Sequence, residues 1–354
     1  MSDPTIQTFC CHHTGKKEDM AVRIMDEFNT DSYNILCLIS SSIGILGAIY
    51  QIFPNIFNHI QGRVTYSRSR EIIVWLAVAD LFASSGVLVR SALWLRYKNI
   101  MPMPDDNISV LFCSVTSAWT QYFYTVSWFW TLFYAIDTWR IIKSRDSNLL
   151  LYHSLAWGLP VATTGIGLSI LYIPNAMCHN LPSLSSALYK ILPNYCATYL
   201  PIAIVMTVNP IMYMLSSKNV EMAVALPLAQ FTSKERRVVD ALRLKFFFIN
   251  VVFYLCWLPN LVNGILVWSM WFDMPVNLII SVWYIMALMN PMQALLNALV
   301  YRKWNTNKWR CLQLCSKKER KESFHFDEQS PLLGSEPRLH LKPIPSSINN
   351  YATL

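Results

Sequence analysis

The chain has 354 residues, of which 54% are hydrophobic, 13% aromatic and only 14% charged. Soluble domains carry roughly 25% charged residues, so this composition excludes an ordinary soluble protein. Ten glycines and 18 prolines exclude a collagen-like or low-complexity fibre. The net charge of +8 is divided among many short segments, whereas nucleic-acid binding requires basic residues gathered on one face.

The first 33 residues are polar and lack the apolar core of a cleavable signal peptide. We therefore expect residues 1–33 to form a lumenal segment and the first span to act as a signal anchor. Seven runs then follow that carry no charge, apart from Asp80 in the second. Each run can hold the roughly 20 apolar residues that cross a bilayer as a helix. They cover residues 32–62, 72–89, 107–136, 147–189, 191–217, 246–272 and 274–301.

The fourth run is long, but Pro174, Cys178 and Pro182 interrupt its second half, so it predicts one span at about 149–173 and then a loop. Twenty Lys and Arg residues lie in the loops after the first, third and fifth spans and after the seventh, against six on the opposite side. Positive loops are cytoplasmic, which places the N-terminus in the lumen or outside the cell. The sequon at Asn107 falls on this predicted lumenal side, so Asn107 is a candidate glycosylation site.

These patterns predict an all-α membrane protein, a bundle of seven transmembrane helices over residues 34–301. Basic residues alternate with Trp and Leu over residues 302–321, which suits an amphipathic helix on the lipid surface with palmitoylated Cys311 and Cys315. Free cytosolic thiols are the alternative. Residues 322–354 are rich in Ser, Pro and Asn and are predicted to be disordered. Within them an acidic residue precedes two leucines by the spacing that clathrin adaptors read for sorting to endosomes and lysosomes: Glu328, Leu332 and Leu333.

Several short motifs in the spans resemble class A G-protein-coupled receptors. LAVADL at 76–81 resembles the pattern around their buried aspartate, CWLP at 256–259 resembles their CWxP switch, and Asn290-Pro291 resembles the start of NPxxY. The resemblance implies a disulfide between Cys113, at the start of the third span, and Cys178 in the next lumenal loop. It also implies a conformational switch built from Trp257, Pro259, Asn290, Pro291 and Asp137.

A narrower set of motifs is ordered along the whole chain from the N-terminus through the seventh span: TFCC at 8–11, YAID at 134–137, LLYH at 150–153, YLP at 199–201 and ERR at 235–237. Together they resemble the ocular albinism type 1 receptor family of pigment-cell organelles. This resemblance implies a receptor of melanosome and lysosome or late endosome membranes, with some at the plasma membrane. It implies a heterotrimeric G-protein partner, a lumenal small-molecule ligand derived from tyrosine, and a role in pigment-organelle biogenesis.

Two departures from the class A pattern concern coupling. Asp137 is followed by Thr138 and not by arginine, and Arg140 lies about 300° around the helix from Asp137. The position three residues after Pro291, where the motif has tyrosine, holds Ala294. A non-coupling organelle scaffold or a transporter is therefore the alternative to a receptor.

Asp80 is a carboxylate in the middle of a span, so it is expected to face the bundle and to be partnered. In related receptors this position holds a sodium ion, for which Ser127 and Asn290 would supply further oxygen atoms. Proton sensing at Asp80 is a second interpretation, and a structural cluster of hydrogen bonds is the third. Apart from this sodium ion, no cofactor is predicted.

Arg90 lies about 15 Å from Asp80 towards the lumen, where it is a candidate to bind a ligand carboxylate. The alternative is that it snorkels to the lipid headgroups. The third span has no acid between residues 107 and 136, so a monoamine ligand would rely on aromatic rings. The other pocket candidates are aromatic or polar side chains at suitable depths: Thr120, Gln121, Tyr124, Trp257, Asn260, Asn263, Trp283 and Tyr284.

Pro259 predicts a kink beside Trp257. Either the kinked segment moves when a ligand binds, or it is static.

The other function classes are less consistent with the sequence. A retinal-binding pump needs a lysine in the seventh span, and residues 274–301 contain none. Transporters usually show internal repeats, which are absent here. An intramembrane enzyme is rejected because His153 stands without the ligand cluster that a zinc site needs.

Overall fold

The computed structural model describes residues 24, 27–60, 68–97, 107–143, 145, 148–172, 184–225, 233–269 and 275–302. The described residues form seven helices, and none of them lies in a strand. The helices are α3 (Thr30–Ile60), α4 (Arg68–Arg96), α5 (Asn107–Ile142), α6 (Leu149–Tyr172), α7 (Leu184–Ala225), α8 (Ser233–Ser269) and α9 (Val276–Arg302). All belong to the first of two units, Met1–Trp304 and Asn305–Leu354. Several predicted features lie outside the described residues: the side chain of Asn107, Cys178, Cys311, Cys315, Glu328, Leu332 and Leu333.

The seven-helix prediction is confirmed. On length and composition alone, five of the described helices are apolar enough to cross a membrane, namely α3, α4, α7, α8 and α9. The other two described helices, α5 and α6, are not among these five. Side-chain caps fix two helix starts, because the Asn29 Oδ1 atom accepts a 3.0 Å hydrogen bond from the Ser32 amide and Asn148 Oδ1 accepts one of 3.1 Å from the Leu150 amide.

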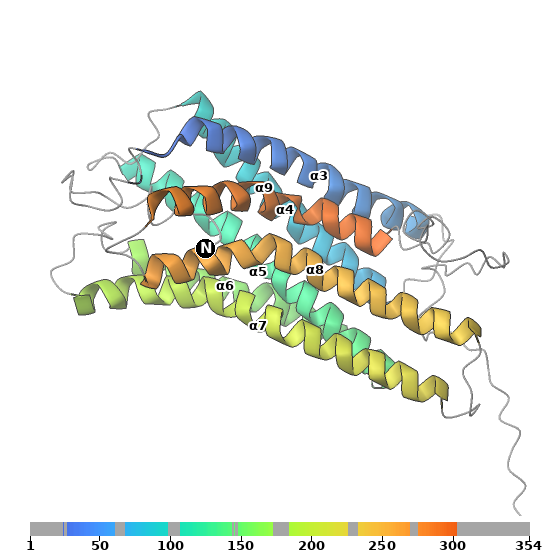
Figure 1. Ribbon diagram of the computed structural model, residues 1–354. Coiled ribbons are helices and arrows are strands. Elements are labelled where there is room, and N and C mark those ends of the chain that lie inside the picture. Colours follow the sequence, from blue (N-terminus) through green and yellow to red (C-terminus); the bar gives the residue numbers. More distant parts are fainter. Residues whose placement is uncertain are drawn as a thin grey trace, which may run out of the picture. The chain divides into compact units, whose positions relative to one another are not determined.

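The helices pack in a bundle in which α5 contacts α4, α6 and α7 (Figure 1). On one side α3 packs against both α4 and α9, and on the other α8 lies between α7 and α9. We call the end at which α3, α5, α7 and α9 begin the lumenal end, as the loop charges predict. Gly44 and Gly47 allow α3 to approach α9 closely, since a Cβ atom at Gly47 would lie 2.6 Å from the Leu295 nitrogen.

The buried side chains form two hydrophobic clusters, one above the other along the bundle axis. The lumenal cluster surrounds Trp257, and the cytoplasmic cluster surrounds Trp130 and Tyr301. Along α4, Ala79 belongs to the cytoplasmic cluster and Ala83 to the lumenal one. Asp80 therefore lies where one cluster gives way to the other.

At two of the prolines, a neighbouring helix donates a hydrogen bond to the carbonyl that the proline leaves free. Proline has no N–H, so the carbonyl four residues earlier loses its partner within the helix. In α7, Pro210 frees the Met206 carbonyl, which accepts a 2.7 Å hydrogen bond from the Tyr254 hydroxyl of α8. In α9, Pro291 frees the Ala287 carbonyl. The Ser40 hydroxyl of α3 donates to it at 2.7 Å.

Candidate functional site

Asp80 is the acid at the centre of the bundle, and its side chain is only 1% exposed. The Ser127 hydroxyl donates to Asp80 Oδ1 at 2.6 Å, and Asn297 Nδ2 donates to Oδ2 at 3.0 Å. A third, longer contact of 3.4 Å comes from Gln293 Nε2. Donors from α5 and α9 thus surround a carboxylate on α4, as a buried charge requires. Ser127, a predicted oxygen donor to a sodium ion at Asp80, therefore lies in direct contact with the carboxylate.

Gln293 joins this acid to Trp257 of the CWLP motif. Its Nε2 atom donates to the Ser127 hydroxyl at 2.9 Å, while its Oε1 atom accepts a 2.6 Å hydrogen bond from the Trp257 indole N–H. Both side chains are buried, with exposures of 2% for Gln293 and 0% for Trp257. An unbroken hydrogen-bonded path therefore runs from Asp80 through Ser127 and Gln293 to the Trp257 indole.

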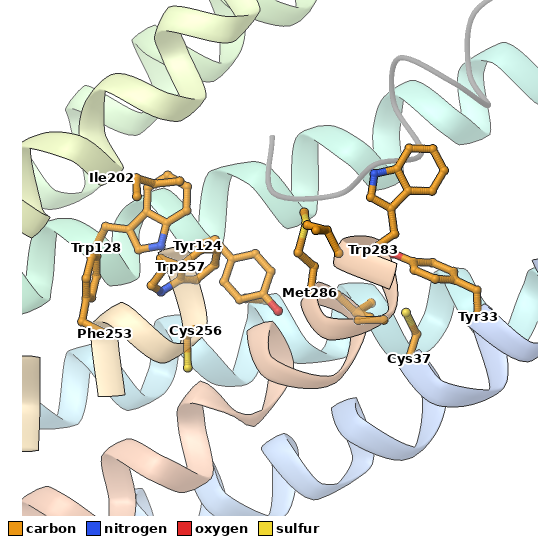
Figure 2. Close-up of a cluster of buried hydrophobic side chains, with 14 of the residues drawn as sticks. Tyr33, Cys37, Tyr124, Trp128, Ile202, Phe253, Cys256, Trp257, Trp283 and Met286 are labelled. Carbon is orange, nitrogen blue, oxygen red and sulfur yellow. The ribbon is translucent and has the colours of Figure 1, made fainter. Parts of the chain in front are cut away.

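The Trp257 indole is enclosed by aromatic rings. Tyr124 and Trp128 of α5 meet it edge to face, with ring centroids at 4.9 and 4.7 Å, and Phe253 lies one turn away on α8 at 6.5 Å. Figure 2 shows these rings gathered at one end of the cluster, and Trp283 with Tyr33 at the other. Such edge-to-face contacts give the indole one preferred orientation.

Asn290 is placed differently from the prediction. Its amide exchanges hydrogen bonds of 2.9 and 3.3 Å with Asn260 of α8, and the asparagine that donates to Asp80 is Asn297. Asn297 also precedes Tyr301 by four residues, which is the spacing of Asn and Tyr in NPxxY, with Ala298 where the motif has proline. The structural counterpart of that motif is therefore 297–301, and its tyrosine is present.

The other pocket candidates form short polar pairs lumenal to Trp257. The Trp283 indole donates to Asn263 Oδ1 at 2.8 Å, and Gln121 Nε2 donates to the Thr198 hydroxyl at 3.2 Å. Thr120 is buried, but its hydroxyl bonds the carbonyl of its own helix at Thr116. The Tyr284 hydroxyl donates at 3.1 Å to the Asn29 carbonyl at the start of α3, near the bundle surface.

Arg90 is inside the bundle. Only 6% of the residue is exposed. A snorkelling arginine keeps its charged head in water or among headgroups, so the burial contradicts that interpretation.

The cytoplasmic end holds Asp137, which is 1% exposed. The Thr138 hydroxyl beside it bonds the Tyr134 carbonyl of its own helix at 2.7 Å. The Tyr134 and Tyr301 rings meet edge to face at 5.1 Å, and the Lys245 ammonium lies 5.9 Å from the Tyr301 ring centroid. Lys245 is itself buried, with 4% of it exposed.

The described cysteines include both a disulfide-bonded residue and free thiols. Cys113 is disulfide-bonded, and its predicted pairing with Cys178 stays a prediction, since Cys178 is not described. Cys37 and Cys256 are free and buried, and Cys196 is free and exposed. Within the described ranges no group of three or more His, Cys, Asp or Glu side chains could hold a metal ion.

Sequence reasoning missed Gln293 and Asn297. A signal was available, because Asn290, Gln293 and Asn297 follow the i, i+3, i+7 spacing of one helix face in an otherwise apolar span. A polar stripe on a membrane helix faces the bundle interior. The resemblance to NPxxY drew the prediction to Asn290-Pro291 instead.

Seven helices around a buried, hydrogen-bonded aspartate, with a tryptophan beside a proline in the sixth, are the arrangement of a G-protein-coupled receptor. The chain belongs to the ocular albinism type 1 protein family, whose pattern it matches over residues 1–329. Membership of this receptor family implies coupling to heterotrimeric G proteins.

The sequence is also similar to two individual proteins over most of its length. The chain is 27% identical to the Homo sapiens protein "G-protein coupled receptor 143" over 323 residues, which cover 86% of this chain and 78% of that protein. It is 22% identical to the Dictyostelium discoideum "Cyclic AMP receptor-like protein A" over 275 residues, which cover 77% of this chain and 64% of that protein.

Proposed function

We propose that this receptor detects a small molecule from the lumenal side through a switch in which Gln293 links the Asp80 carboxylate to Trp257. The observation that carries the proposal is the hydrogen-bonded path from Asp80 through Ser127 and Gln293 to the indole. A ligand that shifts Trp257 alters the donors around Asp80. A change of charge at Asp80 acts on Trp257 by the same path, because equilibrium coupling is reciprocal.

The residues at Asp80 fit a sodium ion or a proton. Asp80 and Ser127 offer the oxygen atoms that a hard cation prefers, and the carboxylate would neutralise its charge. Gln293 and Asn297 direct N–H groups at Asp80, but a carboxamide presents its oxygen when it turns over. Turning Gln293 would remove the acceptor of the Trp257 N–H. The state of the acid and the orientation of the indole are therefore linked.

The side chains lumenal to Trp257 support a small aromatic ligand with an anionic group, as a tyrosine derivative has. Tyr124 and Trp283 supply aromatic surface, Gln121, Asn260 and Asn263 supply amide groups, and Arg90 supplies the buried positive charge. A guanidinium binds a carboxylate with two parallel hydrogen bonds. The ligand class and the residues that contact it belong to this proposal.

The cellular setting is also proposed. We place the receptor in melanosome and lysosome or late endosome membranes, with a role in pigment-organelle biogenesis, as the resemblance to receptors of pigment-cell organelles implies. Sorting there would use a clathrin adaptor bound to Glu328, Leu332 and Leu333. Palmitoylated Cys311 and Cys315 would anchor the segment after α9 to lipid.

The first test brings the receptor to the cell surface with Leu332→Ala and Leu333→Ala, which also tests the sorting signal. G-protein dissociation is then recorded by energy transfer, with and without tyrosine and its catechol derivatives. We expect a dose-dependent response that Gln293→Leu reduces. Asn250→Leu is the matched control, because the Asn250 amide bonds the Phe246 carbonyl of its own helix. Absence of any signal with confirmed surface protein would favour the non-coupling scaffold or transporter.

A further inference from the structure

The bond between Tyr254 and the Met206 carbonyl joins α8 to α7 at a kink. Pro210 leaves that carbonyl without its usual partner, and Tyr254 supplies a replacement at 2.7 Å. The Tyr254 ring itself is 36% exposed on the outer surface of the bundle. Its hydroxyl therefore contributes a directed contact between the two helices, while much of its ring meets the surroundings.

In the structure, the cytoplasmic half of α8 lies against its neighbours. The Phe246 ring stacks on Tyr213 of α7 at 4.6 Å with an angle of 11° between the planes. Lys245, one residue earlier, is buried beside Tyr301 of α9. Tyr254 bonds α7 between this region and the switch at Trp257. This part of α8 therefore contacts both α7 and α9.

The bond is placed where a movement of α8 would break it. Tyr254 precedes Pro259 by five residues, which is about 7.5 Å along the helix on the cytoplasmic side of that kink. A swing of about 15° around Pro259 displaces a point at this distance by about 2 Å, beyond the range in which a hydrogen bond survives. The same displacement leaves the lumenal half of α8 nearly unmoved.

We propose that Tyr254 is a positioning residue of the receptor: its bond to the carbonyl freed by Pro210 holds α8 in the resting position against α7. The inference rests on the proposed function, since it assigns the resting state to the switch described above. It adds a contact on α7 and α8 that none of the sequence motifs contains. Opening of α8 then requires loss of this bond.

The direct test is Tyr254→Phe, which removes one oxygen atom and keeps the ring. Surface receptor carrying the Leu332→Ala and Leu333→Ala changes is compared with and without it. We expect basal G-protein dissociation to rise about two- to tenfold, the population shift that the net strength of one hydrogen bond supports. A basal signal that is unchanged or lower, at equal surface density, overturns the proposal.

Ser40→Ala is the matched control. It removes a hydroxyl that bonds the carbonyl freed by Pro291 at the same 2.7 Å, but it joins α3 to α9 and not to the helix that carries the Trp257 switch. We expect thermal stability to fall and basal signalling to stay unchanged. An equal rise in basal signalling in both variants would mean that any loosening of the bundle activates it, which overturns a specific role for Tyr254.

Pro210→Ala provides a second, independent test. Alanine restores an N–H at position 210, and this group competes with the Tyr254 hydroxyl for the Met206 carbonyl. The effect of Tyr254→Phe should therefore be much smaller in a Pro210→Ala background, and the two changes should be non-additive. Full additivity of the two effects on basal signalling contradicts the bond as the cause.

A distance measurement separates failure of this inference from failure of the proposed function. Spin labels are attached at Leu244→Cys on α8 and Leu151→Cys on α6, which are 48% and 49% exposed, after replacement of the accessible native cysteines by Ser. Tyr254→Phe should populate a longer distance whether or not a G protein couples. A longer distance with no signalling in any variant refutes the receptor function alone. Signalling with an unchanged distance distribution refutes the role of Tyr254.

Discussion

Replacement of Gln293 by leucine tests the path between the acid and the indole most directly. The change removes the acceptor of the Trp257 N–H at 2.6 Å and the donor to Ser127 at 2.9 Å, while Asp80 keeps Ser127 and Asn297. A buried N–H left without a partner costs about 1–3 kcal/mol, and the apolar side chain recovers part of this. We expect a net loss of about 2 kcal/mol in the free energy of unfolding.

That loss corresponds to a fall of about 4–8 °C in the unfolding temperature, which thermal unfolding in nanodiscs would measure. Asn250→Leu should change the free energy of unfolding by less than about 1 kcal/mol, because Asn250 makes a hydrogen bond within its own helix. A double-mutant cycle of Gln293→Leu with Trp257→Phe isolates the bond itself, and we expect a coupling energy of about 1 kcal/mol or more. Additive effects of the two changes would refute the reasoning.

Three further predictions concern helix packing. Gly47→Val should destabilise the bundle by about 1–3 kcal/mol, because its side chain meets the Leu295 backbone. Gly158→Ala, at a glycine with nothing within 4 Å, should be neutral or slightly stabilising in the same thermal assay. A tolerated Gly47→Val would show that α3 and α9 are not held at this distance. Ser40→Ala should cost about 1 kcal/mol through loss of the bond to the Ala287 carbonyl, and an unchanged unfolding temperature would count against that bond.

The seven helices were predictable from the sequence because a bilayer permits few alternatives. A charge-free run of sufficient length must satisfy its backbone internally, and this forces a helix whatever its side chains do. The site was predictable only where a residue type was already costly in lipid. Asp80 stood out for that reason, and Ser127 lay at a plausible depth on the next span.

The seventh span shows why the asparagine that contacts Asp80 could not be predicted. Asn290 and Asn297 lie seven residues apart, about two turns, on the same helix face. Which of them reaches Asp80 depends on how far α9 is displaced along its axis, and no local pattern encodes that displacement. The structure brings Asn297 to Asp80, with α9 packed closely on α3 at Gly47. Arg90 posed the same difficulty, since depth in the sequence does not fix which way a side chain turns.

The polar layer around Asp80 is poorly explained as a source of stability. Buried ionic groups are often no more stabilising than apolar side chains of the same volume, and the hydrophobic clusters above and below already fill the bundle. The layer makes the positions of its side chains depend on one another. Asp80, Ser127 and Gln293 each hydrogen-bond a buried polar group that would otherwise be unpaired, so none of them can move alone. An apolar layer would transmit the position of Trp257 only through packing. A hydrogen-bonded one makes that position depend on the charge of a single carboxylate, which is what a sensor of cations or protons requires.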